Sequence, residues 1–280
     1  MPPSAAPAAD DQARLRDGDA ILFIDRKQRQ YLRTLRFGRP VGVRGPPFAA
    51  EDLIGLLEGS VVRSPSGEYL QIFRPTYAQL VPNLPRQAQV IYPKDVGMIL
   101  VWGDIQPGMR VVEVGVGPGA TAIALLRATG PQGRLISYEI REAFADMARA
   151  NVARFYGPAP QWTLKSGDAY ERIDETGIDR IVIDVPEPWR VLPHAAGALR
   201  PGGVLVGFVP TVLQMKQLVD DLRSGGFAAV EAMESLQRFW HLEDRSVRPE
   251  HRMVAHSGFL VVARRLAPAS NVTRDSEPDS

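Results

Sequence analysis

A glycine-rich segment in the middle of the chain has the residue types of a ligand site. It reads Val111-Val112-Glu113-Val114-Gly115-Val116-Gly117-Pro118-Gly119, so an apolar run passes into glycines at every second position. Glycine lets the backbone turn tightly and approach a ligand where a Cβ atom would clash. Twenty residues beyond Gly119, Glu139 ends a second apolar run, where a carboxylate can accept hydrogen bonds from both hydroxyls of a ribose. The spacing therefore predicts a ligand that contains a nucleoside.

Two cofactors compete for such a turn, and the charge of the segment favours one of them. A dinucleotide site has the spacing G-x-G-x-x-G and points a helix N-terminus at a pyrophosphate. Here the spacing is G-x-G-x-G, and Glu113 stands two residues before the first glycine. A carboxylate there would repel a pyrophosphate but would suit a cationic amino-acid ligand. The E-x-G-x-G-x-G pattern resembles that of the class I S-adenosylmethionine methyltransferases. A tight turn without a ligand is the remaining alternative.

Another carboxylate ends a later strand, in the segment Ile183-Asp184-Val185-Pro186-Glu187-Pro188-Trp189. Ligands of open α/β sheets bind beyond the carboxyl ends of the strands, so we expect Asp184 where a substrate meets the cofactor. Two alternate prolines stiffen the backbone after it, which suits a wall that holds a planar group. The alternative is an Asp that caps the next helix. Asp168 follows the strand between these sites, and by itself it would more often cap a helix or a turn.

The segments that must position these residues alternate between strands and helices. Alternation with short loops predicts a mostly parallel sheet covered on both faces, which is the Rossmann-like α/β class. The strands are expected at 110–114, 133–139, 162–165, 180–184, 203–209, 231–236 and 259–264, and the helices at 120–128, 141–156, 189–199 and 212–224.

A smaller unit with a different pattern precedes this region. Residues 17–82 predict a β-rich domain of two hairpins with a short helix at 51–59 between them, and residues 83–266 form the second domain. The polar ends 1–16 and 267–280 are expected to be disordered. Arg26–Arg44 contains seven basic residues and no acidic one, which indicates either a nucleic-acid contact or a solvated edge strand.

The composition excludes several classes of protein. The chain has 280 residues, of which 45% are hydrophobic and 23% charged, so it can bury a sizeable core. A balance of 33 Lys and Arg against 32 Asp and Glu excludes a polycation. The absence of Cys excludes disulfides, thiolate metal sites and a cysteine nucleophile, and four scattered His predict no metal site. No apolar run could span a bilayer and no signal peptide is evident, so a cytoplasmic protein without membrane contact is expected.

Considered together, the motifs resemble those of the tRNA (adenine-58-N1) methyltransferases from about residue 18 to 266. The glycine turn is common to class I methyltransferases, whereas the Y-P-K-D, D-x-P-x-P-W and R-M-x-x-H-S-x-F segments together are specific. These motifs are Gln89–Asp95, Glu113–Gly119, Asp184–Trp189, Pro210–Gln214, and Arg248-Pro249 with Arg252–Leu260. The resemblance implies methyl transfer from S-adenosylmethionine to N1 of adenine 58 in the T loop of tRNA, and it implies a homotetramer.

The resemblance also implies roles for individual residues. S-adenosylmethionine would be bound by Gln89, Glu113, Gly115, Val116, Gly117, Gly119, Ala120, Thr121, Glu139, Asp168 and Asp184, with Asp168 at the adenine amino group. Asp184, Tyr92 and Phe208 would form the catalytic site. Asp184 would accept the N6 hydrogen bond of the target base, either to stabilise charge or as general base. Tyr92, Phe208 and Trp189 would stack on a base that is splayed out of its pair. Several relatives carry Tyr at the position of Phe208, so a stacking role would survive there but a hydroxyl role would not.

Basic residues would bind the tRNA backbone, with Arg26–Arg44 as the first candidate, followed by Lys94, Arg248 and Arg252. Two alternative functions remain. A class I methyltransferase of a protein or small molecule would have little salt-dependent RNA affinity and no need for the basic segment. A non-catalytic tRNA-binding subunit would have lost part of the glycine turn or the Asp, whereas this chain retains both. The enzyme acting on tRNA is therefore the stronger hypothesis.

Overall fold

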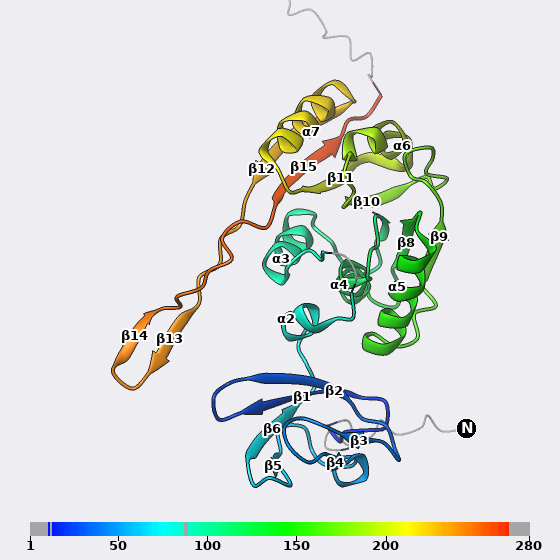
Figure 1. The fold of residues 1–280 in the computed structure, drawn as a ribbon. Coiled ribbons are helices and arrows are strands. Elements are labelled where there is room, and N and C mark those ends of the chain that lie inside the picture. Colours follow the sequence, from blue (N-terminus) through cyan, green and yellow to red (C-terminus); the bar gives the residue numbers. More distant parts are fainter. Residues whose placement is uncertain (1–10, 12, 87–88, 269–280) are drawn as a thin grey trace, which may run out of the picture. The chain divides into compact units, whose positions relative to one another are not determined.

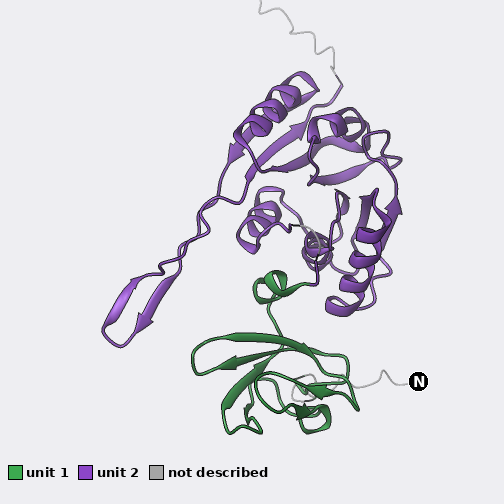
Figure 2. Cartoon of the chain, viewed as in Figure 1, with its two compact units in different colours: residues 1–84 green, residues 85–280 purple. Residues whose placement is uncertain are grey.

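The computed structural model describes residues 11, 13–86 and 89–268 (Figure 1). The described chain divides into two compact units between Leu84 and Pro85, which Figure 2 colours separately. Most of the ends 1–16 and 267–280, for which the sequence predicts disorder, lie outside the described residues. None of the described helices has the length and apolar character that a membrane span requires.

The N-terminal unit contains a four-stranded antiparallel sheet in the order β2-β1-β6-β5. Its two hairpins lie at the predicted places, and β1 joins them because it pairs with both β2 and β6. The rings of Phe23 and Phe48 stack in the core at a centroid distance of 5.7 Å. The elements are β1 (Ala20–Asp25), β2 (Gln30–Thr34), β3 (Pro40–Val41), β4 (Phe48–Ala49), β5 (Val61–Arg63), β6 (Tyr69–Phe73), α2 (Tyr77–Leu80) and η2 (Val81–Asn83).

The helix predicted at 51–59 is wrong, because only the short 3₁₀ helix η1 (Ala50–Asp52) forms there. Gly55 has a left-handed φ of +91°, which ends any helix at that point. Its N–H donates to the Leu15 carbonyl at 2.8 Å, and the Leu15 N–H donates to the Leu56 carbonyl at 2.8 Å. Backbone groups that a helix would pair internally therefore pair with the segment before β1. Leu15 is 1% exposed and belongs to this core, so the ordered unit begins before residue 17.

The second unit is built on a seven-stranded mixed sheet in the order β12-β15-β11-β10-β7-β8-β9, which confirms the predicted Rossmann-like class. The strands from β11 to β9 are parallel, and β15 runs antiparallel to both of its neighbours. These strands are β7 (Arg110–Val114), β8 (Arg134–Glu139), β9 (Trp162–Ser166), β10 (Ile178–Ile183), β11 (Leu199–Val209), β12 (Phe227–Met233) and β15 (Phe259–Arg265). The predicted strand at 231–236 thus lies about three residues too late.

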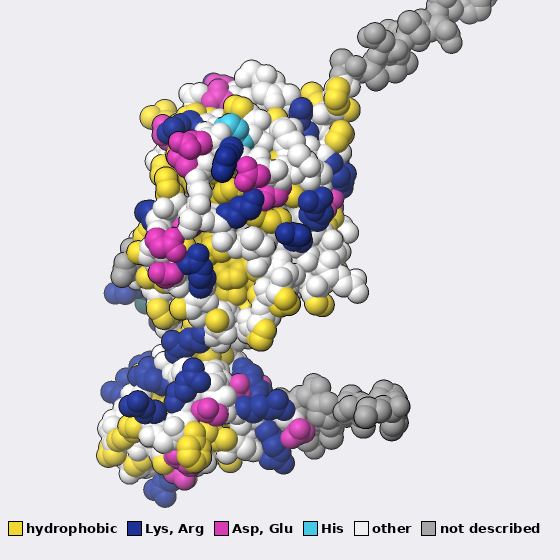
Figure 3. Space-filling view, turned by 90° about the vertical axis from the view of Figure 1, so that its right-hand side faces the viewer, with side chains coloured by type: hydrophobic (Ala, Val, Ile, Leu, Met, Phe, Trp, Pro, Cys, Tyr) yellow, Lys and Arg dark blue, Asp and Glu magenta, His cyan; other side chains and the backbone are white. Residues whose placement is uncertain are grey.

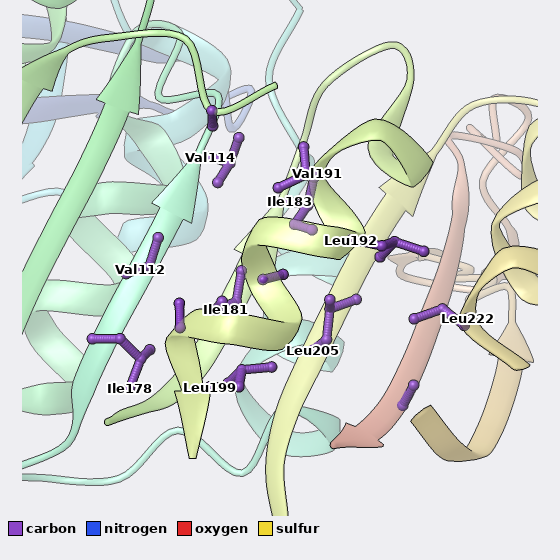
Figure 4. Close-up of a cluster of buried hydrophobic side chains, with 14 of the residues drawn as sticks. Val112, Val114, Ile178, Ile181, Ile183, Val191, Leu192, Leu199, Leu205 and Leu222 are labelled. Carbon is purple, nitrogen blue, oxygen red and sulfur yellow. The ribbon is translucent and has the colours of Figure 1, made fainter. Parts of the chain in front are cut away.

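Helices α3 (Pro93–Trp102), α4 (Ala120–Thr129), α5 (Glu142–Phe155), α6 (Leu192–Ala198) and α7 (Val212–Ser224), with the 3₁₀ helix η3 (Pro188–Val191), belong to this unit. Buried side chains of neighbouring strands, such as Val112, Ile181 and Leu205, pack with Leu192 of α6 in one core (Figure 4). The sequence pattern predicts no helix at 93–102. Pro93 at the first position of α3 instead begins a helix, because its fixed φ suits that position.

A hairpin of β13 (Trp240–Glu243) and β14 (Ser246–Pro249) extends from the second unit, and we call residues 234–258 the arm. Figure 1 shows its two connecting segments running side by side from β12 and β15. The Glu250 N–H donates to the Phe239 carbonyl at 2.9 Å between these segments. Large apolar side chains of the arm are exposed, among them Phe239, Trp240, Leu242 and Val247. The sequence pattern does not predict this arm.

Candidate cofactor and active site

A hollow of about 520 Å³ lies where four parallel strands end. Parallel strands end at one edge of a sheet, so residues far apart in sequence meet there. Of the sequence-predicted residues, Gln89, Gly115, Gly117, Glu139, Asp168 and Asp184 line the hollow. The remaining lining residues are Val114, Tyr138, Ile140, Arg141, Gly167, Ala169, Tyr170, Val185, Pro186 and Glu187.

The glycine turn brings the end of β7 against the end of β10. Gly115 has φ +88°, and a Cβ atom there would lie 2.1 Å from the Asp184 carbonyl oxygen. Only glycine allows this approach, because the clash would be with backbone. Gly117 has φ +52°, and a Cβ atom on it would meet no other atom within 4 Å, so space is open on that side. The turn therefore places Asp184 beside an open glycine surface.

Glu139 is buried, and each of its carboxylate oxygens accepts a backbone hydrogen bond. Oε2 accepts from the Gly117 N–H at 3.1 Å, and Oε1 accepts from the Arg141 N–H at 3.0 Å. Arg141 Nε donates to Oε1 as well, at 3.2 Å. These bonds fix the carboxylate at the edge of the hollow, and a carboxylate oxygen can accept more than one hydrogen bond. The arrangement fits the predicted ribose contact.

Glu113 lies behind the glycine turn with only 1% of its surface exposed. Ser137 Oγ donates to Oε2 at 2.6 Å, while Oε1 has no partner among the described residues. Burial, with a smaller contribution from the negative charges of Asp184 and Glu139, raises the pKa of Glu113 to about 8. A buried carboxylate oxygen without a partner is unfavourable unless a bound group compensates it. This orphaned oxygen fits a cationic ligand.

Asp184 is half-buried and lines the hollow. Its backbone N–H donates to the Val114 carbonyl at 2.8 Å, which fixes the start of the loop. None of the hydrogen bonds among the described residues uses its carboxylate, which leaves both oxygens available to a ligand. Burial raises the pKa of Asp184 to about 7, with a further contribution from the charge of Glu139. A carboxyl group with a pKa near neutrality can exchange a proton at physiological pH.

The sequence analysis does not predict that Ile140 and Tyr170 line the hollow. Ile140 is 65% exposed although it is apolar, and it follows Glu139 directly. An apolar residue just after a strand-ending acid is the signal that could have indicated a ribose or base contact. Tyr170 follows Asp168 by two residues, and its backbone N–H donates to Asp168 Oδ1 at 2.8 Å. Asp168 therefore has the turn-capping role that the sequence left open, and it also lines the hollow.

Several sequence-predicted site residues do not line the hollow. Glu113 is buried behind the glycine turn and Val116 is buried within it, Gly119 packs on α5, and Ala120 and Thr121 are buried at the start of α4. Tyr92 is half-buried as the residue that precedes α3. Phe208 is 9% exposed, and a Cβ atom on Gly258 would lie 2.3 Å from its ring. Gly258 therefore lies against the tip of the Phe208 ring. The binding and stacking roles of these residues stay predictions.

The assignment of Lys94 to the tRNA contact is wrong. Its side chain is 8% exposed, and its Nζ lies 2.7 Å from Asp95 Oδ1 and donates to the Ser235 carbonyl at 2.8 Å. Ser257 Oγ donates to Asp95 Oδ2 at 2.6 Å. The Y-P-K-D and H-S segments therefore meet and attach α3 to the root of the arm. A lysine held in this way is not available to a phosphate.

Comparison with known proteins identifies the family. Residues 68–257 match the family described as tRNA methyltransferase complex GCD14 subunit. The chain belongs to this family. It is 30% identical to the tRNA (adenine(57)-N(1)/adenine(58)-N(1))-methyltransferase TrmI of Methanocaldococcus jannaschii, over 92% of this chain and 98% of that protein. It is 33% identical to the tRNA (adenine(58)-N(1))-methyltransferase TrmI of Thermus thermophilus, over 88% of this chain and 96% of that protein.

Solved structures of similar proteins agree with this GCD14-family membership. The tRNA (m1A58) methyltransferase TrmI of Aquifex aeolicus superposes with a TM-score of 0.79 at 27% identity, over 91% of this chain and all of that one (100%). A protein from Thermotoga maritima described as a SAM-dependent O-methyltransferase superposes with a TM-score of 0.88 at 29% identity, over 94% of this chain and 98% of that one. Both units of the chain are therefore found together in these relatives.

Proposed function

We propose that this protein transfers a methyl group from S-adenosylmethionine to N1 of adenine 58 in the T loop of tRNA. The relatives named TrmI share nearly the full length of the chain. The observation that carries the proposal is Asp184, whose carboxylate is free of partners among the described residues and lies beside the glycine turn in the same hollow as Glu139. A protein or small-molecule methyltransferase would not need the basic segment of the N-terminal unit.

The residues of the hollow fit S-adenosylmethionine. Glu139 would accept hydrogen bonds from the ribose hydroxyls, and Asp168 would lie at the adenine amino group. The orphaned Oε1 of Glu113 suits the positive charge of the amino-acid part. The cofactor supplies an electrophilic methyl group on a sulfonium sulfur. The open space beside Gly117 gives the cofactor room to approach the backbone there.

Asp184 is the candidate catalytic residue. Neutral adenine N1 has a lone pair, so it can form the new N–C bond without prior removal of a proton, as the methyl–sulfur bond breaks. The base then becomes cationic, and a carboxylate that accepts the N6 hydrogen bond stabilises this charge as it develops. Because its pKa lies at about 7, Asp184 can then take the N6 proton and leave a neutral methylated base. The glycine turn and the Val114 carbonyl hold the backbone of Asp184 in place for both roles.

The N-terminal unit would bind the tRNA backbone. Lys and Arg side chains gather on the face of this unit in Figure 3. Within the described part of the chain, Arg29 is the member of Arg26–Arg44 that forms an ion pair, with Asp25 at 2.7 Å. Arg33 donates to the Leu32 and Gly42 carbonyls, and the remaining positive charges of the segment can contact phosphates, which supply most nonspecific RNA affinity. Arg26 lies over the exposed ring of Tyr69 at 5.1 Å, beside a hollow of about 410 Å³ between the two hairpin tips.

We also propose the homotetramer that the family resemblance implies. Exposed apolar residues of the arm, such as Trp240 and Leu242, support an interface there, since a contiguous exposed apolar surface marks an interaction site. Native mass spectrometry of the wild type and of a Trp240→Glu, Leu242→Glu double variant tests this. A tetramer that the double variant retains would place the interface elsewhere, and a monomeric wild type would refute the assembly. The cytoplasmic location stays a prediction that cell fractionation would test.

The direct test of the activity uses the purified full chain with labelled S-adenosylmethionine and an unmodified tRNA transcript. Mass spectrometry of nuclease fragments should find 1-methyladenosine at position 58. A transcript with guanosine at position 58 and the Asp184→Ala protein should both give no product. Label found only in protein, or at an unrelated nucleotide, would refute the proposal. The same fragments show whether adenine 57 is also modified.

A further inference from the structure

A single peptide group of the loop after Asp184 is held from two sides by side chains. The carbonyl of Pro186 accepts from Gln214 Nε2 at 2.9 Å. The N–H of the same peptide group, which belongs to Glu187, donates to Tyr170 Oη at 3.1 Å. In a trans peptide the C=O and N–H point in opposite directions, so the two side chains lie on opposite sides of the group. Gln214 comes from α7 and Tyr170 from the loop after β9.

This peptide group carries part of the rotational freedom that the loop has left. Pro186 and Pro188 each have a fixed φ, because the ring closes on the backbone nitrogen. Upstream, Asp184 is fixed by its bond to the Val114 carbonyl and by its contact with Gly115. The rotations left are those of Val185 and those on either side of the Pro186–Glu187 peptide. Hydrogen bonds at both ends of this peptide remove the second set.

Each of the two side chains is itself fixed by neighbours. Thr211 Oγ1 donates to Gln214 Oε1 at 2.6 Å and accepts from the Gln214 N–H at 3.2 Å, so the first turn of α7 orients the amide. The ring of Tyr170 lies under the Arg190 guanidinium at 4.2 Å. The backbone N–H of Tyr170 donates to Asp168, which lines the hollow. Tyr170 thus connects the cofactor side of the hollow to the loop.

We propose that Gln214 and Tyr170 are positioning residues that hold the Pro186–Glu187 peptide, and through it align the Asp184 carboxylate with the target base. This inference rests on the proposed methyl transfer for its kinetic consequence but not for its structural one. A misplacement of about 1 Å at a reacting group can lower a rate by about a hundredfold. The loss of either side chain's hydrogen bond should therefore reduce turnover more than it reduces cofactor binding or stability.

Two near-isosteric variants test the two bonds separately. Gln214→Glu keeps the oxygen that accepts from Thr211 but replaces the amide N–H that reaches Pro186. Tyr170→Phe removes the hydroxyl that accepts from Glu187 and keeps the ring under Arg190. The matched controls make the same changes elsewhere. Gln217 lies on the exposed face of α7, so Gln217→Glu is the control for Gln214→Glu. The Tyr156 hydroxyl accepts from Gln161 outside the hollow, so Tyr156→Phe is the control for Tyr170→Phe.

Each test variant should lower kcat for tRNA methylation by about ten- to a hundredfold, with the Kd for S-adenosylmethionine and the melting temperature close to wild type. The double variant should be no slower than the slower single variant, because both bonds serve one peptide group. Effects that multiply would show two independent roles. A lower melting temperature with unchanged kcat would show a structural role alone. Either result would overturn the proposal.

Hydrogen exchange gives a measurement that does not depend on the RNA substrate. The Glu187 amide should exchange faster in Tyr170→Phe and in Gln214→Glu than in wild type and in both controls. If wild type fails to methylate tRNA but this amide still responds, the proposed function fails and the peptide clamp stands. If the amide exchanges at the wild-type rate in both test variants, the clamp is refuted whatever the enzyme methylates.

Discussion

Replacing Glu113 with Gln should remove most of the proton release that accompanies S-adenosylmethionine binding. Burial raises the pKa of Glu113 to about 8 and that of Asp184 to about 7. At pH 7 about nine in ten Glu113 carboxyls and about half of the Asp184 carboxyls of the free protein therefore carry a proton. A cation bound beside these groups favours both ionised forms and expels the protons.

The size of the effect follows from these fractions. Wild type should release up to about 1.4 protons per cofactor bound at pH 7, and Glu113→Gln should release about 0.5, from Asp184 alone. The variant should also bind about ten- to a hundredfold more weakly, because it loses a buried charge pair whose ionisation costs wild type about 1.4 kcal/mol at pH 7. Wild-type affinity should weaken steadily as the pH falls below about 8, and the variant should lose most of that dependence.

Isothermal titration calorimetry at pH 7, in buffers of different ionisation enthalpy, measures the protons released. Glu187→Gln is the matched control, since it removes a carboxylate at the rim of the same hollow that is half exposed. Its proton release should equal that of wild type. Equal release from wild type and Glu113→Gln, or equal affinities, would refute the idea that Glu113 faces the cofactor's positive charge.

Three further results follow from the same geometry. Asp184→Asn should lower turnover by about a hundredfold or more, a larger loss than its loss of cofactor affinity. Wild-type kcat/KM should fall as the pH drops below about 7, because a protonated Asp184 cannot accept a proton. A loss of cofactor binding that matches the loss of turnover would instead mark this Asp as structural. Gly115→Ala should destabilise the protein by about 2 kcal/mol or more and abolish activity, because its Cβ would strike the Asp184 backbone. Gly117→Ala should destabilise the protein less, because its Cβ meets no atom within 4 Å and only its φ of +52° is unfavourable, and equal melting temperatures for the two would contradict this reasoning. The free protein should lose stability as the pH rises from about 4.5 to about 8 and level off above that, because the folded state keeps Glu113 protonated over this range while the unfolded chain does not. Thermal melts of Glu113→Gln between pH 6 and 9 should lack that decline.

Much of the cofactor side could be predicted from the sequence because it depends on local geometry. Glu139 and Asp184 directly end or follow buried strands, and parallel strands must bring such ends to one edge of the sheet. The positive φ of Gly115 was likewise implied by glycines at a strand-to-helix turn. These features need only the alternation of strands and helices, which the apolar pattern already indicates.

Other features depend on contacts between residues distant in sequence. The segment at 51–59 has the pattern of a helix, but its backbone groups pair with Leu15. Lys94 reads as a basic residue near the site, yet it pairs with Asp95 and Ser235 inside the second unit. Tertiary hydrogen bonds here override local preference, and nothing near either position in the chain indicates that Leu15 or Ser235 comes into contact with it.

By itself, the sequence determined the Rossmann-like class, the glycine turn with its carboxylates, the likeness to tRNA methyltransferases and the basic segment Arg26–Arg44. Each is encoded by residue types and their spacing along the chain. Only the tertiary structure decided that Glu113 and Asp184 share a poorly solvated site, and that Tyr170 and Gln214 hold one peptide of the loop after Asp184. Burial and hydrogen-bond partnership are properties of the folded arrangement, because they depend on which distant segments come within a few ångströms.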